Sequence, residues 1–395
     1  GAVLEVNAAP GFRMHLDPTE GLPRNVAEPV IDMLYPPGST ARIPIIAVSG
    51  TNGKTTTTRM IAHIVKQMGH KVGYTTTDGV YIQNQMMMRG DCTGPKSAEF
   101  VLRDPTVDFA VLECARGGIL RAGLGFHNCD IAVVTNVAED HLGLQGIDTI
   151  EKLARVKAVA PNTVPASGYV ILNADDDLVY KMREEVVAKV ALFSLDENNP
   201  RIKEHCKTGG IAAIYENGFV TILKGTWKIR IDKVSDIPIT FSGKAIFNIA
   251  NTLAAILATY LCEFKTDDIR QALQTFIPSP AMTPGRMNMF QFKNFNVMLD
   301  YAHNTHGLQA IGKFVDSVDA TPKVGIIAGV GDRRDEDIIS LGEESAKIFD
   351  EIIIRQDKNL RGRTEAEMLM LITKGIRNIK PDISVIDFRK ESDAI

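Results

Sequence analysis

The residues best suited to chemistry in this sequence form one short loop, residues 50–55, which reads Gly-Thr-Asn-Gly-Lys-Thr. An apolar run at residues 45–48 precedes the loop, and a helical pattern at residues 59–68 follows it. Glycines allow backbone N–H groups to close on phosphate oxygens, and the N-terminus of the next helix adds a favourable dipole. Lys54 is placed to reach terminal phosphates and the Thr55 hydroxyl to bind Mg²⁺, although the first glycine of the usual motif is missing. The sequence therefore predicts a nucleotide site formed by Gly50, Thr51, Asn52, Gly53, Lys54, Thr55 and Thr56.

Two further candidate residues follow predicted strands. Glu113 ends the apolar run 109–113, and His141 comes shortly after the run 131–136. Ligands of parallel, doubly wound sheets collect at the carboxyl ends of the strands. With Thr55, these two side chains would supply oxygen and nitrogen ligands to Mg²⁺ beside the phosphates. Taken singly, Glu113 could equally be a solvated strand end, and His141 could equally be a helix cap.

The elements that must position these residues alternate between apolar strands and helices. Over residues 43–283 this alternation predicts an α/β domain built on a doubly wound parallel sheet. Residues 211–242 differ, because hairpin signals there predict a small antiparallel extension whose last strand covers residues 237–241. Prolines at residues 277–285 mark a boundary.

A second strand–helix series occupies residues 284–395 and predicts a Rossmann-like C-terminal domain. Its first strand is predicted at residues 297–301. A further helix is predicted to start at Glu391, close to the last residue. A sheet left half covered would be unstable, so we expect this domain to be truncated.

The first 42 residues differ from the rest of the chain. Glu5 and Asn7 share one face of a short predicted strand, and two such oxygen side chains can bind a hard cation. A polar strand face explains them as well. We assign residues 1–20 to the end of a preceding domain and the proline-rich residues 21–42 to a linker with one short helix.

Composition excludes several classes of protein. A formal net charge of −4 argues against a general nucleic-acid binder, and the apolar runs are too short to span a bilayer. The five cysteines are odd in number and show no CxxC pairing, which fits reduced thiols better than disulfides or zinc. We therefore expect a cytoplasmic enzyme that binds neither nucleic acid nor membrane.

Six segments in a fixed order carry a family resemblance. They are residues 50–55, Glu113, residues 135–142 (Thr-Asn-Val-Ala-Glu-Asp-His-Leu), 247–251 (Phe-Asn-Ile-Ala-Asn), 284–286 (Pro-Gly-Arg) and 300–304 (Asp-Tyr-Ala-His-Asn). Together they resemble the Mur ligase superfamily of ATP-dependent amide ligases, which includes peptidoglycan amino-acid adders and folylpolyglutamate synthase. The resemblance covers the chain from about residue 43 to its end. It implies ATP and Mg²⁺ as cofactors, a carboxylate that attacks the γ-phosphate, and an amine that displaces phosphate from the acyl phosphate.

The resemblance also implies roles for single residues. Lys54 and Thr55 would hold phosphates and the first Mg²⁺, with Glu113 on that metal and His141 on a second. The nucleotide would be completed by Asn248 and Asn251 on the adenine side, Arg286 at the γ-phosphate and Asp300 at the ribose. His303 and Asn304 belong to the same motif as Asp300.

One lysine carries a separate implication. Lys157 matches a lysine that many members of the superfamily carry as a carbamate, which would make it a metal ligand. The alternative is a solvated helix lysine, and Lys152 on the same helix is the competing candidate.

The substrates are implied by a second resemblance. Glu5-Val6-Asn7 with Pro10-Gly11 is similar to the last strand of an ATP-grasp domain. An ATP-grasp tail that leads into a Mur ligase module resembles polymer synthetases that add arginine to the β-carboxyl of aspartate. This implies arginine and an aspartate-containing primer as partners, and we also expect a homo-oligomer. Two alternatives stay open: another Mur-type ligase of the peptidoglycan or folylpolyglutamate class, and a non-catalytic nucleotide-binding module of a synthetase.

Charged residues supply candidates for binding these substrates. Carboxylates suit the guanidinium fork of arginine, and cations suit the aspartate carboxylates of the primer. The acidic candidates are Asp332, Asp335, Glu336, Asp337 and Asp357, and the basic candidates are Arg116, Arg121, Arg361 and Arg363. Any single one of them is also explained as a solvated surface charge.

Overall fold

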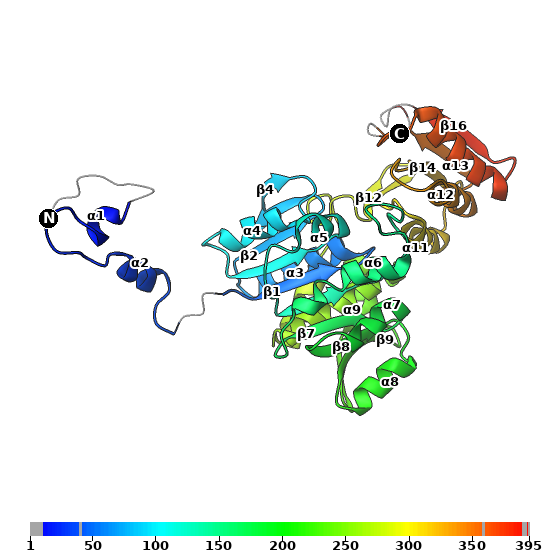
Figure 1. Cartoon of the computed structure of the whole chain (residues 1–395). Helices are drawn as coiled ribbons and strands as arrows, with labels where there is room; N and C mark the ends of the chain where they lie inside the picture. The colour runs from blue at the N-terminus through cyan, green and yellow to red at the C-terminus, as the bar shows by residue number, and fades with distance from the viewer. Residues whose placement is uncertain (1–10, 39–41, 358–359, 389–392, 394–395) are drawn as a thin grey trace. The chain divides into compact units, whose positions relative to one another are not determined.

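The structure is a computed structural model that describes residues 11–38, 42–357, 360–388 and 393 (Figure 1). The chain divides into two units, Gly1–Ile43 and Pro44–Ile395. Two short helices are described in the first unit, α1 (Arg13–Leu16) and α2 (Ala27–Leu34). The predicted strand with Glu5 and Asn7 and the predicted helix start at Glu391 lie outside the described residues. Within the described residues, no helix is both long and apolar enough to cross a membrane.

One eleven-stranded sheet organises the larger part of the second unit. Its strand order is β11-β10-β9-β8-β7-β6-β1-β5-β2-β3-β4. The strands from β9 to β2 in this order run parallel, and the pairs at both ends of the sheet are antiparallel. The strands are β1 (Ile45–Ser49), β2 (Val72–Thr76), β3 (Gly79–Ile82), β4 (Gln85–Arg89), β5 (Phe109–Glu113), β6 (Ile131–Val134), β7 (Tyr169–Asn173), β8 (Lys189–Ser194), β9 (Ile211–Glu216), β10 (Phe219–Lys224) and β11 (Trp227–Lys233).

Helices cover this sheet (Figure 1), and two of them, α3 and α9, contribute much of the helical part of its main core. α9 is apolar around most of its circumference, which is typical of a fully buried helix. It packs beside α3, and residues of both helices join the strands in one large hydrophobic cluster. The helices are α3 (Lys54–Gln67), α4 (Pro95–Arg103), α5 (Arg116–Ala122), α6 (Ile150–Lys157), α7 (Asp177–Lys181), α8 (Pro200–Lys207), α9 (Ile246–Leu261) and α10 (Thr266–Gln274).

The remaining residues form two smaller sheets. β12 (Asn288–Gln291) and β13 (Asn296–Leu299) make an antiparallel pair, and β14 (Val324–Ile327), β15 (Glu351–Arg355) and β16 (Ser384–Phe388) make a parallel sheet. The helices α11 (Thr305–Asp316), α12 (Asp335–Ile348) and α13 (Glu365–Ile379) accompany them. The predicted fold class is confirmed: a doubly wound central sheet with an antiparallel extension, followed by a parallel, Rossmann-like sheet. The extension continues the main sheet through the β8–β9 pair.

One predicted strand is wrong, and a second predicted strand forms but pairs in a different sheet. Residues 237–241 contain a 3₁₀ turn, Pro238–Thr240, in place of a strand. Pro238 has no N–H for a ladder, and the Thr240 hydroxyl donates to the carbonyls of Val234 and Ile237. The strand predicted at residues 297–301 is present as β13, but in the described part of the chain it pairs with β12 in a two-stranded sheet and does not join the parallel sheet, because a tight turn connects it directly to β12. Apolar content alone indicated burial and could not distinguish these arrangements.

Candidate active site

The predicted phosphate loop connects β1 to α3 at the centre of the main sheet. β1 lies between β6 and β5, so the chain ends of these three strands meet at one edge. Gly50 and Gly53 have φ values of 137° and 85°, in the range that glycine tolerates best. A Cβ at Gly50 would lie 2.0 Å from Thr135 Oγ1, and one at Gly53 would lie 2.2 Å from Asn251 Oδ1. Both positions therefore require glycine.

The loop is fixed to the end of β6 by hydrogen bonds. Thr51 N–H donates to the Asn136 carbonyl at 2.8 Å, and Asn52 N–H donates to Asn136 Oδ1 at 2.9 Å. The Thr135 hydroxyl donates to the Asn52 carbonyl at 2.7 Å. Lys54 Nζ donates to the Thr51 carbonyl at 2.7 Å, so its charge already lies over the loop.

Glu113 forms an oxygen cluster with two threonines. Thr55 Oγ1 donates to Glu113 Oε2 at 2.9 Å, and Thr77 Oγ1 donates to Glu113 Oε1 at 3.0 Å. Carboxylate and hydroxyl oxygens are the ligands that Mg²⁺ prefers, so the donor set fits the predicted ion. Thr77 was missed from sequence. Its position directly after β2 was the signal that could have identified it.

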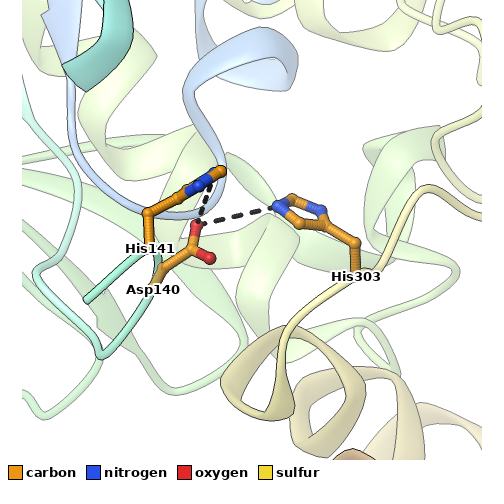
Figure 2. A group of neighbouring side chains, drawn as sticks. All are labelled: Asp140, His141 and His303. Atoms are coloured by element: carbon orange, nitrogen blue, oxygen red, sulfur yellow. Dashed lines mark ion pairs between the residues drawn. The ribbon is translucent and has the colours of Figure 1, made fainter. Parts of the chain in front are cut away.

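His141 lies in a second cluster, with Asp140 and His303 (Figure 2). The two imidazole Nε2 atoms lie 4.0 Å and 3.7 Å from Asp140 Oδ2. Arg333 enters the same cluster: its guanidinium nitrogens lie 2.6 Å and 3.0 Å from the two ring nitrogens of His141 and 2.8 Å from Asp140 Oδ1. The structure thus brings Thr55 and Glu113 together but places His141 against a cation from the C-terminal part of the chain.

Electrostatics in this second cluster favour an anionic Asp140 and a neutral His141. Burial opposes the Asp140 charge, but the His303 hydrogen bond and Arg333 outweigh it and lower the pKa of Asp140 well below its usual range. Burial, together with Arg333, lowers the pKa of His141 to about 4. A neutral imidazole can offer a nitrogen lone pair to a metal ion.

Lys157 points into the site and Lys152 does not. Lys157 is buried, and its Nζ donates to the Gly50 carbonyl at 2.7 Å. Burial, with a contribution from Lys54, lowers the pKa of Lys157 to about 7. Lys152 is exposed and binds Asp148 and the Gly146 carbonyl on the surface.

The four residues expected around the rest of the nucleotide lie in the same site as the phosphate loop. Asn251 donates to Asn248 Oδ1 at 3.0 Å, and Asn248 donates to the Ile239 carbonyl. Arg286 Nη2 lies 3.5 Å from Thr55 Oγ1. Asp300 accepts from two backbone N–H groups, and burial raises its pKa.

A cavity of about 950 Å³ joins these groups. Fourteen residues were expected in the site from sequence. Thirteen of them line this cavity: Thr51, Asn52, Gly53, Lys54, Thr55, Thr56, Glu113, His141, Lys157, Asn248, Asn251, Arg286 and Asp300. Gly50 contacts the site through its carbonyl. Arg333 also lines the cavity and was missed from sequence, although its place in a charged run after β14 is typical of a ligand-binding loop.

Comparison with known proteins agrees with this geometry. The Mur ligase middle domain matches residues 48–259, and the Mur ligase, glutamate ligase domain matches residues 285–393. The chain belongs to the Mur ligase family of ATP-dependent ligases.

Individual members of this family show which proteins the chain is similar to. The chain is 54% identical over its whole length to a cyanophycin synthetase of Geminocystis herdmanii, and it spans 45% of that protein. Among solved structures, E. coli FolC in complex with DHPP and ADP has a TM-score of 0.65 at 18% identity, over 90% of this chain and 82% of FolC. A bifunctional folylpolyglutamate synthase/dihydrofolate synthase with Mn, AMPPNP and L-glutamate bound has a TM-score of 0.60 at 20% identity, over 88% and 86% of the two chains. These two structures support the fold.

Proposed function

We propose that this chain is the module of a cyanophycin synthetase that adds arginine to the β-carboxyl of aspartate in a growing polymer. The observation that carries the proposal is the cavity, which joins the phosphate loop to cations and a carboxylate from the C-terminal part of the chain. The proposed substrates are those implied by the resemblance described in the sequence analysis, and the match of the whole chain to a cyanophycin synthetase supports the proposal. Because the chain spans less than half of that relative, the proposal concerns this module alone.

The reaction has two steps. An aspartate β-carboxylate oxygen attacks the γ-phosphorus of ATP, the bond to the ADP oxygen breaks, and an acyl phosphate forms. The arginine amine then attacks the acyl carbon, phosphate leaves, and the amine loses a proton as the amide forms.

The residues near the loop suit the first step. Lys54 and Arg286 bring positive charge to the transferring phosphoryl group, and Thr55 with Glu113 would hold Mg²⁺. Bound Mg²⁺ neutralises charge on the phosphates and on the attacking carboxylate. His141 and Lys157 would hold a second ion, Lys157 after conversion to a carbamate.

Some of the charged residues that are candidates for substrate binding line the cavity, and others do not. Of the five acidic candidates, all of which lie in the described part of the chain, Asp332 is the one that lines the cavity. Asp335 and Asp337 pair with Arg363 and Arg334. Asp332 is also paired, with Arg333 and Arg361. The basic candidates that line the cavity are Arg116, Arg121 and Arg361. We therefore assign the primer carboxylates to this arginine group and the substrate guanidinium to Asp332, where it would compete with Arg361.

Isotope transfer tests the direction of the reaction. With ¹⁸O in the aspartate β-carboxylate, one labelled oxygen should appear in each phosphate released, because that oxygen bridges the acyl phosphate. Mass spectrometry of the phosphate reads the result. Label arriving from the arginine carboxylate would reverse the two roles and reject the proposal.

Arg333 provides a second prediction, on metal binding. A metal ion on either His141 nitrogen would lie against the guanidinium, and two cations within about 4 Å repel by about 4 kcal/mol at an effective dielectric constant of 20. Arg333→Ala should therefore raise the affinity of the His141 site for Mn²⁺ by at least roughly tenfold, as measured by the EPR signal of free Mn²⁺.

The neighbouring arginine is the matched control. Arg334 pairs with Glu139 and Asp337, so Arg334→Ala should leave Mn²⁺ affinity close to that of the parent chain. Equal Mn²⁺ affinities in the parent and Arg333→Ala would show that Arg333 does not compete with a metal ion at His141.

A further inference from the structure

Two asparagines that are 252 residues apart in sequence bind each other beside the cavity. Asn52 belongs to the phosphate loop, and Asn304 immediately precedes α11. Asn304 Nδ2 donates to Asn52 Oδ1 at 3.1 Å, and Asn52 Nδ2 donates to Asn304 Oδ1 at 3.3 Å. The two side-chain amides therefore form a reciprocal pair, in which each residue is donor and acceptor.

The Asn304 side of the pair is rigidly held. Asn304 is 7% exposed and is the N-cap of α11, where its Oδ1 also accepts from Gly307 N–H at 2.8 Å. This double use of one oxygen fixes the orientation of the amide, so Nδ2 is left to face Asn52. A helix N-cap residue with a tertiary partner is thus more than a stabiliser of its own helix.

His306 adds a second contact from the same helix. Its Nδ1 lies 2.9 Å from Asn52 Nδ2, which can donate its second hydrogen there. Burial lowers the pKa of His306, so the neutral ring has a nitrogen free to accept. Both hydrogens of the Asn52 amide are then directed at α11.

The loop itself is held from two sides. The backbone of Asn52 is bound by Thr135 and Asn136 at the end of β6, whereas its side chain is bound by the start of α11. The glycines on either side, Gly50 and Gly53, impose little conformational restraint of their own. The shape of the loop therefore depends on contacts with both parts of the second unit.

We propose that Asn304 is a positioning residue of the phosphate loop, which holds Asn52 so that the loop keeps its nucleotide-binding shape only while α11 is docked on it. The proposal rests on the proposed nucleotide site. Because such coupling is reciprocal, ATP bound at the loop should strengthen the docking of α11 by the same factor. Nucleotide affinity thereby becomes dependent on the C-terminal part of the chain.

Three variants of the 395-residue chain test this inference: Asn304→Ser, Asn52→Ala and the double variant. Serine is also a good N-cap but has no amide, so Asn304→Ser keeps α11 capped and removes only the pair. We expect the thermal midpoint to change little. Without nucleotide, amide exchange at Thr51 and Asn52 should accelerate roughly tenfold, the effect of about one to two hydrogen bonds. The ATP dissociation constant should rise by a similar factor.

The double variant decides whether the two residues act through each other. If they do, it should be no worse than the more affected single variant. Additive effects, or unchanged loop exchange in Asn304→Ser, would overturn the inference. Failure of the parent chain to bind ATP would reject the proposed function instead, and the exchange measurement would still report on the pair because it needs no nucleotide.

Discussion

Lys54→Ala should lower the rate of ATP-dependent ligation by about two to three orders of magnitude, the usual cost of removing a group that stabilises transition-state charge. The loop should largely keep its shape, because the backbone N–H groups of Thr51 and Asn52 donate to Asn136 and these two hydrogen bonds do not involve the lysine. Lys54 Nζ lies on the Thr51 carbonyl, from which a short movement would bring it to a bound phosphate. The loss should therefore fall mainly on kcat, measured as phosphate release that depends on primer and arginine.

Lys66 supplies the control for this change. It lies in the last turn of the same helix, away from the loop, so Lys66→Ala should keep the parent rate. If Lys54→Ala retained near-normal arginine incorporation, the loop would not be the site of phosphoryl transfer.

Lys157→Ala should lose most of its ligation activity, whereas Lys152→Ala should keep it. The two lysines are five residues apart on α6, or about 140° around the helix axis, so they cannot share one environment. Lys157 is buried against the Gly50 carbonyl, and Lys152 is bound at the surface. Small carboxylic acids should partly restore Lys157→Ala if the parent lysine acts as a carbamate. The reverse ranking of the two variants would reject the assignment.

The pH dependence of this lysine follows from its environment. Only the neutral amine attacks CO₂, forming the N–C bond of a carbamate with release of one proton. Because the pKa of Lys157 is lowered to about 7, the neutral form predominates above that pH and not only above 10. Stimulation by bicarbonate should therefore rise between about pH 6 and 8. A rise only above pH 9 would mean that Lys157 is not the reacting group.

Much of the site could be predicted because its residues lie at the ends of strands that can be recognised in the sequence. The glycine–lysine loop comes directly after β1, and Glu113 comes at the end of β5, so strand ends alone place them together. The contacts that were missed join segments far apart in sequence: Arg333 with His141, and Asn304 with Asn52. Nothing local indicates such pairs, since an arginine after a strand and an asparagine before a helix each have an ordinary local role.

The errors in the fold have a related cause. The apolar residues Ile237 and Ile239 are buried as expected, but burial is compatible with a turn when a proline removes a ladder donor. Likewise, the apolar pattern of β13 does not state which strand will be its neighbour. The partner strand is decided by the short turn between β12 and β13. Phe292 and Phe295 stand on either side of this turn, and their rings stack on each other.

Arg286 differs from the other arginines of the site in its position along the chain. It lies in the single covalent connection between α10 and β12, where Gly285 and Met287 have positive φ values. If the residues from β12 onward rotated about this connection, Arg286 would lie close to the rotation axis. Arg333 and Asn304 would lie farther from that axis. A residue at a pivot moves least, so Arg286 would keep its distance to Thr55 through an opening that separates the other two from their partners.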